Sequence, residues 1–138
     1  MIDQGPSENA DSLPGYGEMI LIVDDEVEIL KIAKTILGRK GYRVETASSG
    51  EAALELLARH GDEIKLVLTD VMMPNMDGLK LVCAIRNLGF KCPIIATSGY
   101  GGEQFKKELL ALDVENFLTK PFDARLLLAV VQQALWGV

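Results

Sequence analysis

The chain has 138 residues, of which 49% are apolar and 25% are charged, and its formal net charge is −6. This composition is ordinary for one globular domain, and the acidic balance, with no basic stripe, argues against binding to nucleic acid or to anionic membranes. No apolar run approaches the roughly 20 residues needed to span a bilayer, so we expect a cytoplasmic protein without membrane contact.

Residues 1–17 are rich in glycine, proline, serine, asparagine and aspartate. Such a composition predicts a flexible linker or tail, and the segment has neither the basic start nor the apolar centre of a secretory signal. We therefore expect the folded domain to occupy residues 18–138.

The rest of the chain alternates between short apolar segments and segments in which apolar residues recur every three or four positions. The first kind predicts strands and the second predicts helices. The predicted strands are residues 19–23, 42–47, 65–70, 93–98 and 115–120, and the predicted helices are residues 26–40, 50–61, 77–89, 103–112 and 122–136.

Five strand–helix repeats imply a parallel sheet with helices on both faces. The strands at 19–23, 65–70 and 93–98 are almost wholly apolar until their ends, as expected of central strands, whereas 42–47 and 115–120 alternate with polar residues. The sequence therefore predicts an α/β fold, a flavodoxin-like doubly wound (βα)5 domain whose five-stranded parallel sheet has the order 2-1-3-4-5.

Polar side chains stand at the ends of four predicted strands. Asp24 and Asp25 follow the first strand, Asp70 ends the third, Ser98 ends the fourth and Lys120 ends the fifth. In open α/β sheets, sites form beyond the carboxyl ends of strands, near the point where the strand order reverses. We therefore expect three carboxylates, a hydroxyl and an ammonium to share one cleft.

The charges of this cleft predict its chemistry. Two carboxylates ~4 Å apart repel each other by about 4 kcal/mol at an effective dielectric near 20, and Lys120 supplies only one positive charge. An oxygen-only site with open positions suits Mg²⁺, with Mn²⁺ as an alternative. Asp70 would stay ionised and could attack phosphorus to give an aspartyl phosphate, whose oxygens Ser98 could bind.

Four motifs carry a resemblance to a known family. They are "LIVDDE" (21–26), "LVLTDVMMPNMDG" (66–78), "IIATSGY" (94–100) and "FLTKPF" (117–122). Taken in this order at these strand ends, they make residues 18–138 resemble the receiver domain of two-component response regulators. The resemblance implies a signalling switch rather than a classical enzyme.

The resemblance also implies the roles of individual residues. Asp70 would be the phosphoacceptor and would take its phosphoryl group from a histidine kinase or a histidine phosphotransfer domain. Asp24 and Asp25 would form the acidic pocket, with Asp25 as the direct Mg²⁺ ligand, and the main-chain carbonyl of Met72 would bind the same ion. Lys120 would contact the phosphoryl group and precede a cis peptide bond to Pro121.

In the family, a hydroxyl and an aromatic residue form a switch pair, which here would be Ser98 and Phe117. Phe117 replaces the commoner tyrosine, so the polar tip of the ring is absent. The switch would alter the surface formed by 103–112, 115–120 and 122–136, where a homodimer could also form. Without the resemblance, Ser98 could simply stabilise its glycine-rich turn, and Phe117 could be an ordinary core residue.

Two large side chains occupy positions that influence access of water to the phosphoryl group in the family. These are Met72, two residues after Asp70, and Tyr100, two residues after Ser98. Neither side chain can readily orient an attacking water, which predicts slow self-dephosphorylation.

Other functions fit the sequence less well. A phosphatase of the haloacid-dehalogenase type needs a second aspartate two residues after the nucleophile, where this chain has Met72. The full set of acidic residues, Ser98 and Lys120 argues against a flavin-binding domain and against a degenerate receiver. The sequence is compatible both with a stand-alone regulator and with a receiver from a hybrid histidine kinase. The segments "TSGY" and "KPF" resemble those of receivers in such kinases.

Overall fold

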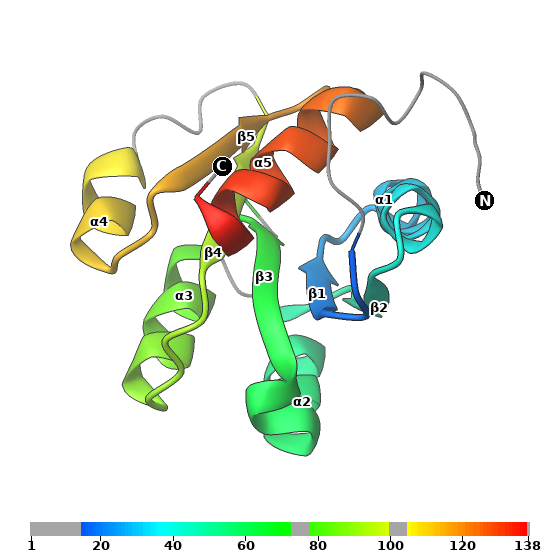
Figure 1. Cartoon of the computed structure of the whole chain (residues 1–138). Helices are drawn as coiled ribbons and strands as arrows, with labels where there is room; N and C mark the ends of the chain where they lie inside the picture. The colour runs from blue at the N-terminus through cyan, green and yellow to red at the C-terminus, as the bar shows by residue number, and fades with distance from the viewer. Residues whose placement is uncertain (1–14, 73–77, 100–104, 138) are drawn as a thin grey trace.

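The computed structural model describes residues 15–72, 78–99 and 105–137 and shows a sheet with helices on both faces (Figure 1). In chain order the elements are β1 (Met19–Val23), α1 (Val27–Arg39), β2 (Arg43–Ala47), α2 (Gly50–His60), the short 3-10 helix η2 (Gly61–Glu63), β3 (Ile64–Asp70), α3 (Gly78–Asn87), β4 (Ile94–Ser98), α4 (Lys106–Ala111), β5 (Asn116–Thr119) and α5 (Ala124–Trp136). Each predicted strand and helix is present, with its ends shifted by a few residues at most.

The sheet is parallel throughout and has the order β2-β1-β3-β4-β5, which confirms the predicted fold class. Every residue of β1 is buried, whereas the edge strands β2 and β5 are mostly half-buried or exposed. The apolar and alternating segments of the sequence therefore distinguished central strands from edge strands correctly, because a strand covered on both faces needs no polar side.

The helices form two layers, one on each face of the sheet (Figure 1). Leu57 of α2, Ile85 of α3 and Leu109 of α4 belong to the apolar cluster on one face. Leu37 of α1 and Leu127 of α5 belong to the cluster on the other face. Each such fully buried side chain stabilises the fold by roughly 1.5–3 kcal/mol, so the two clusters fix the sheet between the helices.

The start of α5 lies directly after the end of β5. Lys120 and Pro121 are joined by a cis peptide bond, as the family resemblance implies. Asp123 then caps α5, and its Oδ1 accepts a hydrogen bond of 2.8 Å from the main-chain N–H of Leu126. Such caps stabilise a helix by about 1 kcal/mol, and this one lies three residues after Lys120, so that α5 begins at Ala124.

Residues 15–17, the last part of the predicted linker, contact the turn between α1 and β2. The Gly15 N–H donates to the Lys40 carbonyl at 2.6 Å, and the Gly17 N–H donates to the Gly41 carbonyl at 2.9 Å. Gly41 has a φ of 99°, and a Cβ there would lie 2.7 Å from the Gly15 carbonyl oxygen. The close approach of the two chain segments therefore requires glycine at position 41.

None of the helices in the described ranges is both long enough and apolar enough to cross a membrane.

Candidate functional site

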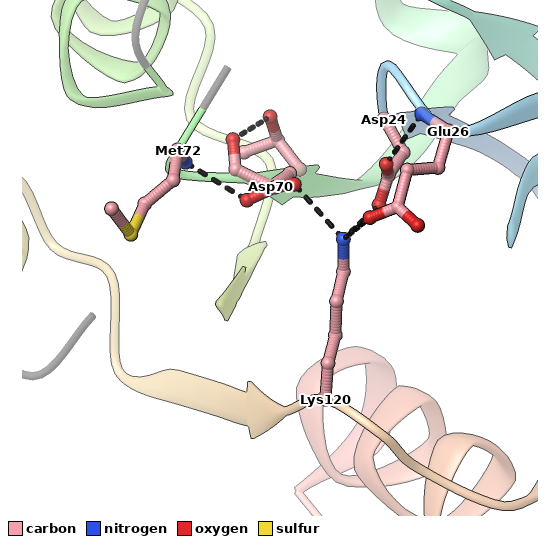
Figure 2. A network of polar contacts seen from close by, with 6 residues as sticks. Asp24, Glu26, Asp70, Met72 and Lys120 are labelled. Atoms are coloured by element: carbon pink, nitrogen blue, oxygen red, sulfur yellow. Dashed lines mark hydrogen bonds and ion pairs between the residues drawn. The ribbon is translucent and has the colours of Figure 1, made fainter. Parts of the chain in front are cut away.

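The ammonium of Lys120, the residue after β5, meets carboxylates from the ends of β1 and β3 at the carboxyl edge of the sheet (Figure 2). The Nζ of Lys120 lies 2.7 Å from Oδ2 of Asp24 and 2.9 Å from Oδ2 of Asp70. It also lies 3.3 Å from Oε2 of Glu26, just before α1. The strand order explains this arrangement, because β1, β3, β4 and β5 are successive neighbours and their carboxyl ends lie at one edge.

The two buried carboxylates are held in the same way. Asp24 is only 1% exposed and Asp70 only 4%, and buried charges are costly unless they are paired and hydrogen-bonded. Oδ1 of Asp24 accepts the Glu26 N–H at 2.9 Å, and Oδ1 of Asp70 accepts the Met72 N–H at 2.8 Å. Each carboxylate therefore has one oxygen on a main-chain N–H and the other on the ammonium of Lys120.

Electrostatic interactions keep Lys120 charged. Burial lowers the pKa of Lys120, but its hydrogen bonds to Asp24 and Asp70 and their negative charges outweigh burial. The pKa of Lys120 is therefore higher than that of a free lysine, and the side chain stays protonated at neutral pH.

The pKa of Asp24 is raised in this crowded site. Burial is the main influence on the pKa of Asp24 and raises it, and the nearby charge of Asp70 adds to the increase. The hydrogen bonds from Lys120 and from the Glu26 N–H, together with the charge of Lys120, act in the opposite direction without cancelling it. A further positive charge at this position would relieve the site.

Four carboxylates are close enough to bind one cation. One oxygen from each of Asp24, Asp25, Glu26 and Asp70 lies within 4.8 Å of the others. Asp24 and Asp70 are buried, whereas Asp25 and Glu26 are exposed, so the cluster is open to solvent. Hard oxygen donors with an accessible side suit Mg²⁺, and the residues present therefore fit the ion that the sequence predicts.

Ser98 is joined to the site through its main chain. Its carbonyl accepts the Lys120 N–H at 2.8 Å, which places the base of the lysine beside β4. In the described part of the chain, no hydrogen bond joins the Ser98 hydroxyl to the acidic cluster.

Phe117 is paired in register with Ala96 of β4 and packs against the apolar cluster beneath α2, α3 and α4. The Nζ of Lys106, at the start of α4, lies 4.9 Å from the centroid of the Phe117 ring. The sequence analysis singled out Phe117 but did not predict this contact with Lys106.

The sequence predicts that Met72 and Tyr100 influence dephosphorylation. Met72 is 47% exposed, and its side chain extends away from Asp70, Asp24 and Lys120 (Figure 2). Tyr100 lies outside the described residues.

Two residues near Asp70 were not singled out from the sequence. Glu26 directly follows the aspartate pair, and this position was the available signal for its contact with Lys120. Gly78 begins α3, and a Cβ there would collide with the Asp70 carbonyl oxygen and with Cα of Val71. Glycine therefore allows α3 to start directly against the end of β3.

Comparisons with known proteins identify the family of this chain. The family model described as "Response regulator receiver domain" matches residues 20–132. The response regulator GtcR of Aneurinibacillus migulanus is 35% identical over 116 residues, which are 84% of this chain and 47% of that protein. The sensor kinase CckA of Brucella abortus is 35% identical over 128 residues, which are 93% of this chain and 13% of that protein.

A solved structure has the same fold. The chemotaxis protein CheY4 of Vibrio cholerae superimposes with a TM-score of 0.81 and 30% sequence identity, over 86% of this chain and 99% of that chain. The curated relatives are longer, and this chain spans about half of GtcR and a much smaller part of CckA. Because the family model matches most of the sequence and the fold agrees, the chain belongs to the response regulator receiver domains, the signalling modules of two-component systems.

Proposed function

We propose that Asp70 accepts a phosphoryl group from a phosphohistidine of a histidine kinase or a histidine phosphotransfer domain. The observation that carries this proposal is the position of Asp70, which is buried at the end of β3 and lies 2.9 Å from the ammonium of Lys120. A carboxylate can act as a nucleophile, and the adjacent ammonium offsets the negative charge of an approaching phosphoryl group.

The transfer itself needs little covalent chemistry from the protein. An oxygen of Asp70 attacks phosphorus, the P–N bond of the phosphohistidine breaks, and the nitrogen keeps the electron pair. The other ring nitrogen of the phosphohistidine carries a proton before transfer, so the leaving group is neutral imidazole and no general acid from this chain is required. The Met72 N–H orients the carboxylate through Oδ1, and Lys120 is placed to move from Oδ2 of Asp70 to an oxygen of the incoming group.

The acidic cluster supports a metal-assisted transfer. Asp24, Asp25, Asp70 and the Met72 carbonyl would hold Mg²⁺, or Mn²⁺ as an alternative. When bound, the ion supplies positive charge for the phosphoryl oxygens, which repel an incoming carboxylate. Glu26 lies within the same cluster and can bind the ion or a water molecule of its hydration shell.

Phosphorylation would shift an equilibrium between two conformers of the surface formed by α4, β5 and α5. The Ser98 hydroxyl would turn to a phosphoryl oxygen, and Phe117, two positions before Thr119 in β5, would change its packing. Ser98 pairs with Thr119 in register, and this pairing supports coupling between the two strands. The same surface would form a homodimer or receive a partner.

The proposal is tested by incubating the protein with acetyl phosphate and Mg²⁺ and measuring its intact mass. We expect a gain of one phosphoryl group in the wild-type protein and none in Asp70→Asn. Asp62→Asn is a matched control, because Asp62 is exposed in η2 and lies outside the acidic cluster. A wild-type protein that gains no mass, or an Asp70→Asn variant that gains as much, contradicts the proposal.

A further inference from the structure

Helix α4 is attached to the rest of the domain by few contacts. It has six residues, and Leu109 is the only one of them that is buried. Its neighbour Leu110 is 50% exposed. The position of α4 therefore depends strongly on the interactions at its two ends.

The end of α4 is fixed by the guanidinium of Arg86, which belongs to α3. Arg86 donates hydrogen bonds to the carbonyl oxygens of Leu112 at 2.8 Å and Asp113 at 3.3 Å, directly after α4. It also donates to the carbonyls of Phe90 at 3.0 Å and Cys92 at 2.8 Å, between α3 and β4. Charge-assisted hydrogen bonds are roughly twice as strong as neutral ones, so this end of α4 is firmly joined to α3.

The start of α4 is held differently. Lys106 is exposed, and its ammonium lies 4.9 Å from the centre of the Phe117 ring, within the range of a cation–π interaction. A phenylalanine ring has no hydroxyl with which to form a hydrogen bond. In this chain, Lys106 is therefore the charged partner that connects the ring of Phe117 to α4.

We propose that the contact between Lys106 and Phe117 stabilises the conformer described here, in which the Ser98 hydroxyl makes no hydrogen bond to the acidic cluster. The inference rests on the proposed function, because it assigns Lys106 as a positioning residue that regulates the phosphoacceptor site. In the described structure the contact is present while the Ser98 hydroxyl has no hydrogen bond to the acidic cluster. A ligand of Asp70 that binds the Ser98 hydroxyl and repositions Phe117, as proposed above, would break the contact with Lys106.

Thermodynamic linkage gives the direction of the effect. A contact that forms in only one conformer lowers the affinity for any ligand that binds the other conformer more tightly. By thermodynamic linkage, that ligand weakens the contact by the same factor. An exposed cation–π interaction changes an equilibrium by about two- to five-fold. Removing the ammonium of Lys106 should therefore favour occupation of the Asp70 site by about this factor.

The contact itself is tested first, without a phosphoryl analogue. The rotamer populations of the Phe117 side chain are measured by NMR in the wild-type protein and in Lys106→Gln, Lys106→Arg and Lys107→Gln. Lys107→Gln removes the same charge from the next position of α4 and is the matched control. We expect Lys106→Gln to change the rotamer ratio about two- to five-fold, and Lys106→Arg and Lys107→Gln to leave it unchanged. An unchanged ratio in Lys106→Gln contradicts the inference.

Coupling to the site is tested by titrating the same four proteins with beryllofluoride in the presence of Mg²⁺. We expect Lys106→Gln to bind beryllofluoride about two- to five-fold more tightly than the wild-type protein, with Lys106→Arg and Lys107→Gln close to wild type. If the wild-type protein binds and Lys106→Gln binds equally, or if Lys107→Gln shows the same gain, the regulatory role of Lys106 is wrong. If the wild-type protein binds no beryllofluoride, the proposed function itself is wrong.

Discussion

The ammonium of Lys120 and Oδ2 of Asp70 lie 2.9 Å apart, although the two residues are 50 positions apart in the chain and their strands are separated by β4. The cis peptide bond to Pro121 follows Lys120 directly. The contact between Lys120 and Asp70 neutralises one carboxylate charge of the cluster. Among the described residues one ammonium therefore faces four clustered carboxylates, which leaves an excess of three negative charges when all are ionised.

Magnesium should therefore stabilise the folded protein. We expect the midpoint of urea unfolding to rise when MgCl₂ replaces EDTA, with a gain of about 2.7 kcal/mol at a concentration of 100 Kd. Asp25→Asn should reduce this gain, and in EDTA it should be at least as stable as the wild type because one repulsion is removed. Glu28→Gln, in the first turn of α1 and outside the cluster, should behave like the wild type. A midpoint that does not respond to Mg²⁺ contradicts a cation site.

Substitutions of two helical glycines should have opposite effects. Gly78→Ala places a methyl group against the Asp70 carbonyl and Val71, and we expect it to lower the free energy of unfolding by about 1–3 kcal/mol. Gly38→Ala in α1 meets no atom within 4 Å and should raise this free energy by about 0.5–1 kcal/mol. Urea unfolding measures the free energy of unfolding of both variants. If Gly78→Ala and Gly38→Ala changed this free energy equally, the close approach of α3 to β3 would not exclude a side chain at position 78.

Tyr42 should make stability sensitive to alkaline pH. Burial, with a smaller contribution from the charge of Glu18, raises the pKa of Tyr42 to about 12 from about 10. Because the folded state keeps this proton longer, its contribution to stability is complete below about pH 10 and is lost as the pH rises through about 12. Absorbance titration of phenolate should show one late-titrating tyrosine that is absent from Tyr42→Phe. A Tyr42→Phe titration with the late step intact would contradict this assignment.

Phosphate release from the phosphorylated protein should be slow. The Met72 N–H holds Asp70, while the Met72 side chain points away and offers no group that orients water (Figure 2). We expect Met72→Asn to accelerate release by about tenfold, which is less than the roughly 10²–10⁴-fold effect of a positioned acid or base. Leu88→Asn, at a more exposed apolar position after α3, serves as the control. A wild-type lifetime of seconds would contradict slow release, and a Met72→Asn variant that releases phosphate no faster than the wild type would contradict the role of Met72.

The order of the strands and the meeting of Asp24, Asp25, Asp70 and Lys120 could be predicted from the sequence. Strands that helices cover on both faces consist almost wholly of apolar residues. The two remaining strands, which contain polar residues, are therefore predicted to be edge strands. Once the order is known, the parallel direction brings the strand ends together. The positions of these four residues follow from topology and do not depend on detailed side-chain conformations.

The contacts made by Arg86 and Lys106 could not be predicted in this way. Both residues are long cations on helices, where most such side chains point into solvent. Their partners lie on other elements, and the contacts depend on how each helix is rotated and tilted on the sheet. Sequence spacing reports which face of a helix is buried, but it does not report which neighbour a flexible side chain reaches.

The most direct test of the central claim is to locate the phosphoryl group by trapping it. After reaction with acetyl phosphate and Mg²⁺, borohydride reduces an aspartyl phosphate to the alcohol, and trypsin releases residues 66–80, which contain both Asp70 and Asp77. We predict that fragmentation of this peptide places the alcohol at Asp70, and that the product is lost when EDTA replaces Mg²⁺. An alcohol at Asp77 or outside this peptide, or an equal yield in EDTA, would contradict the account.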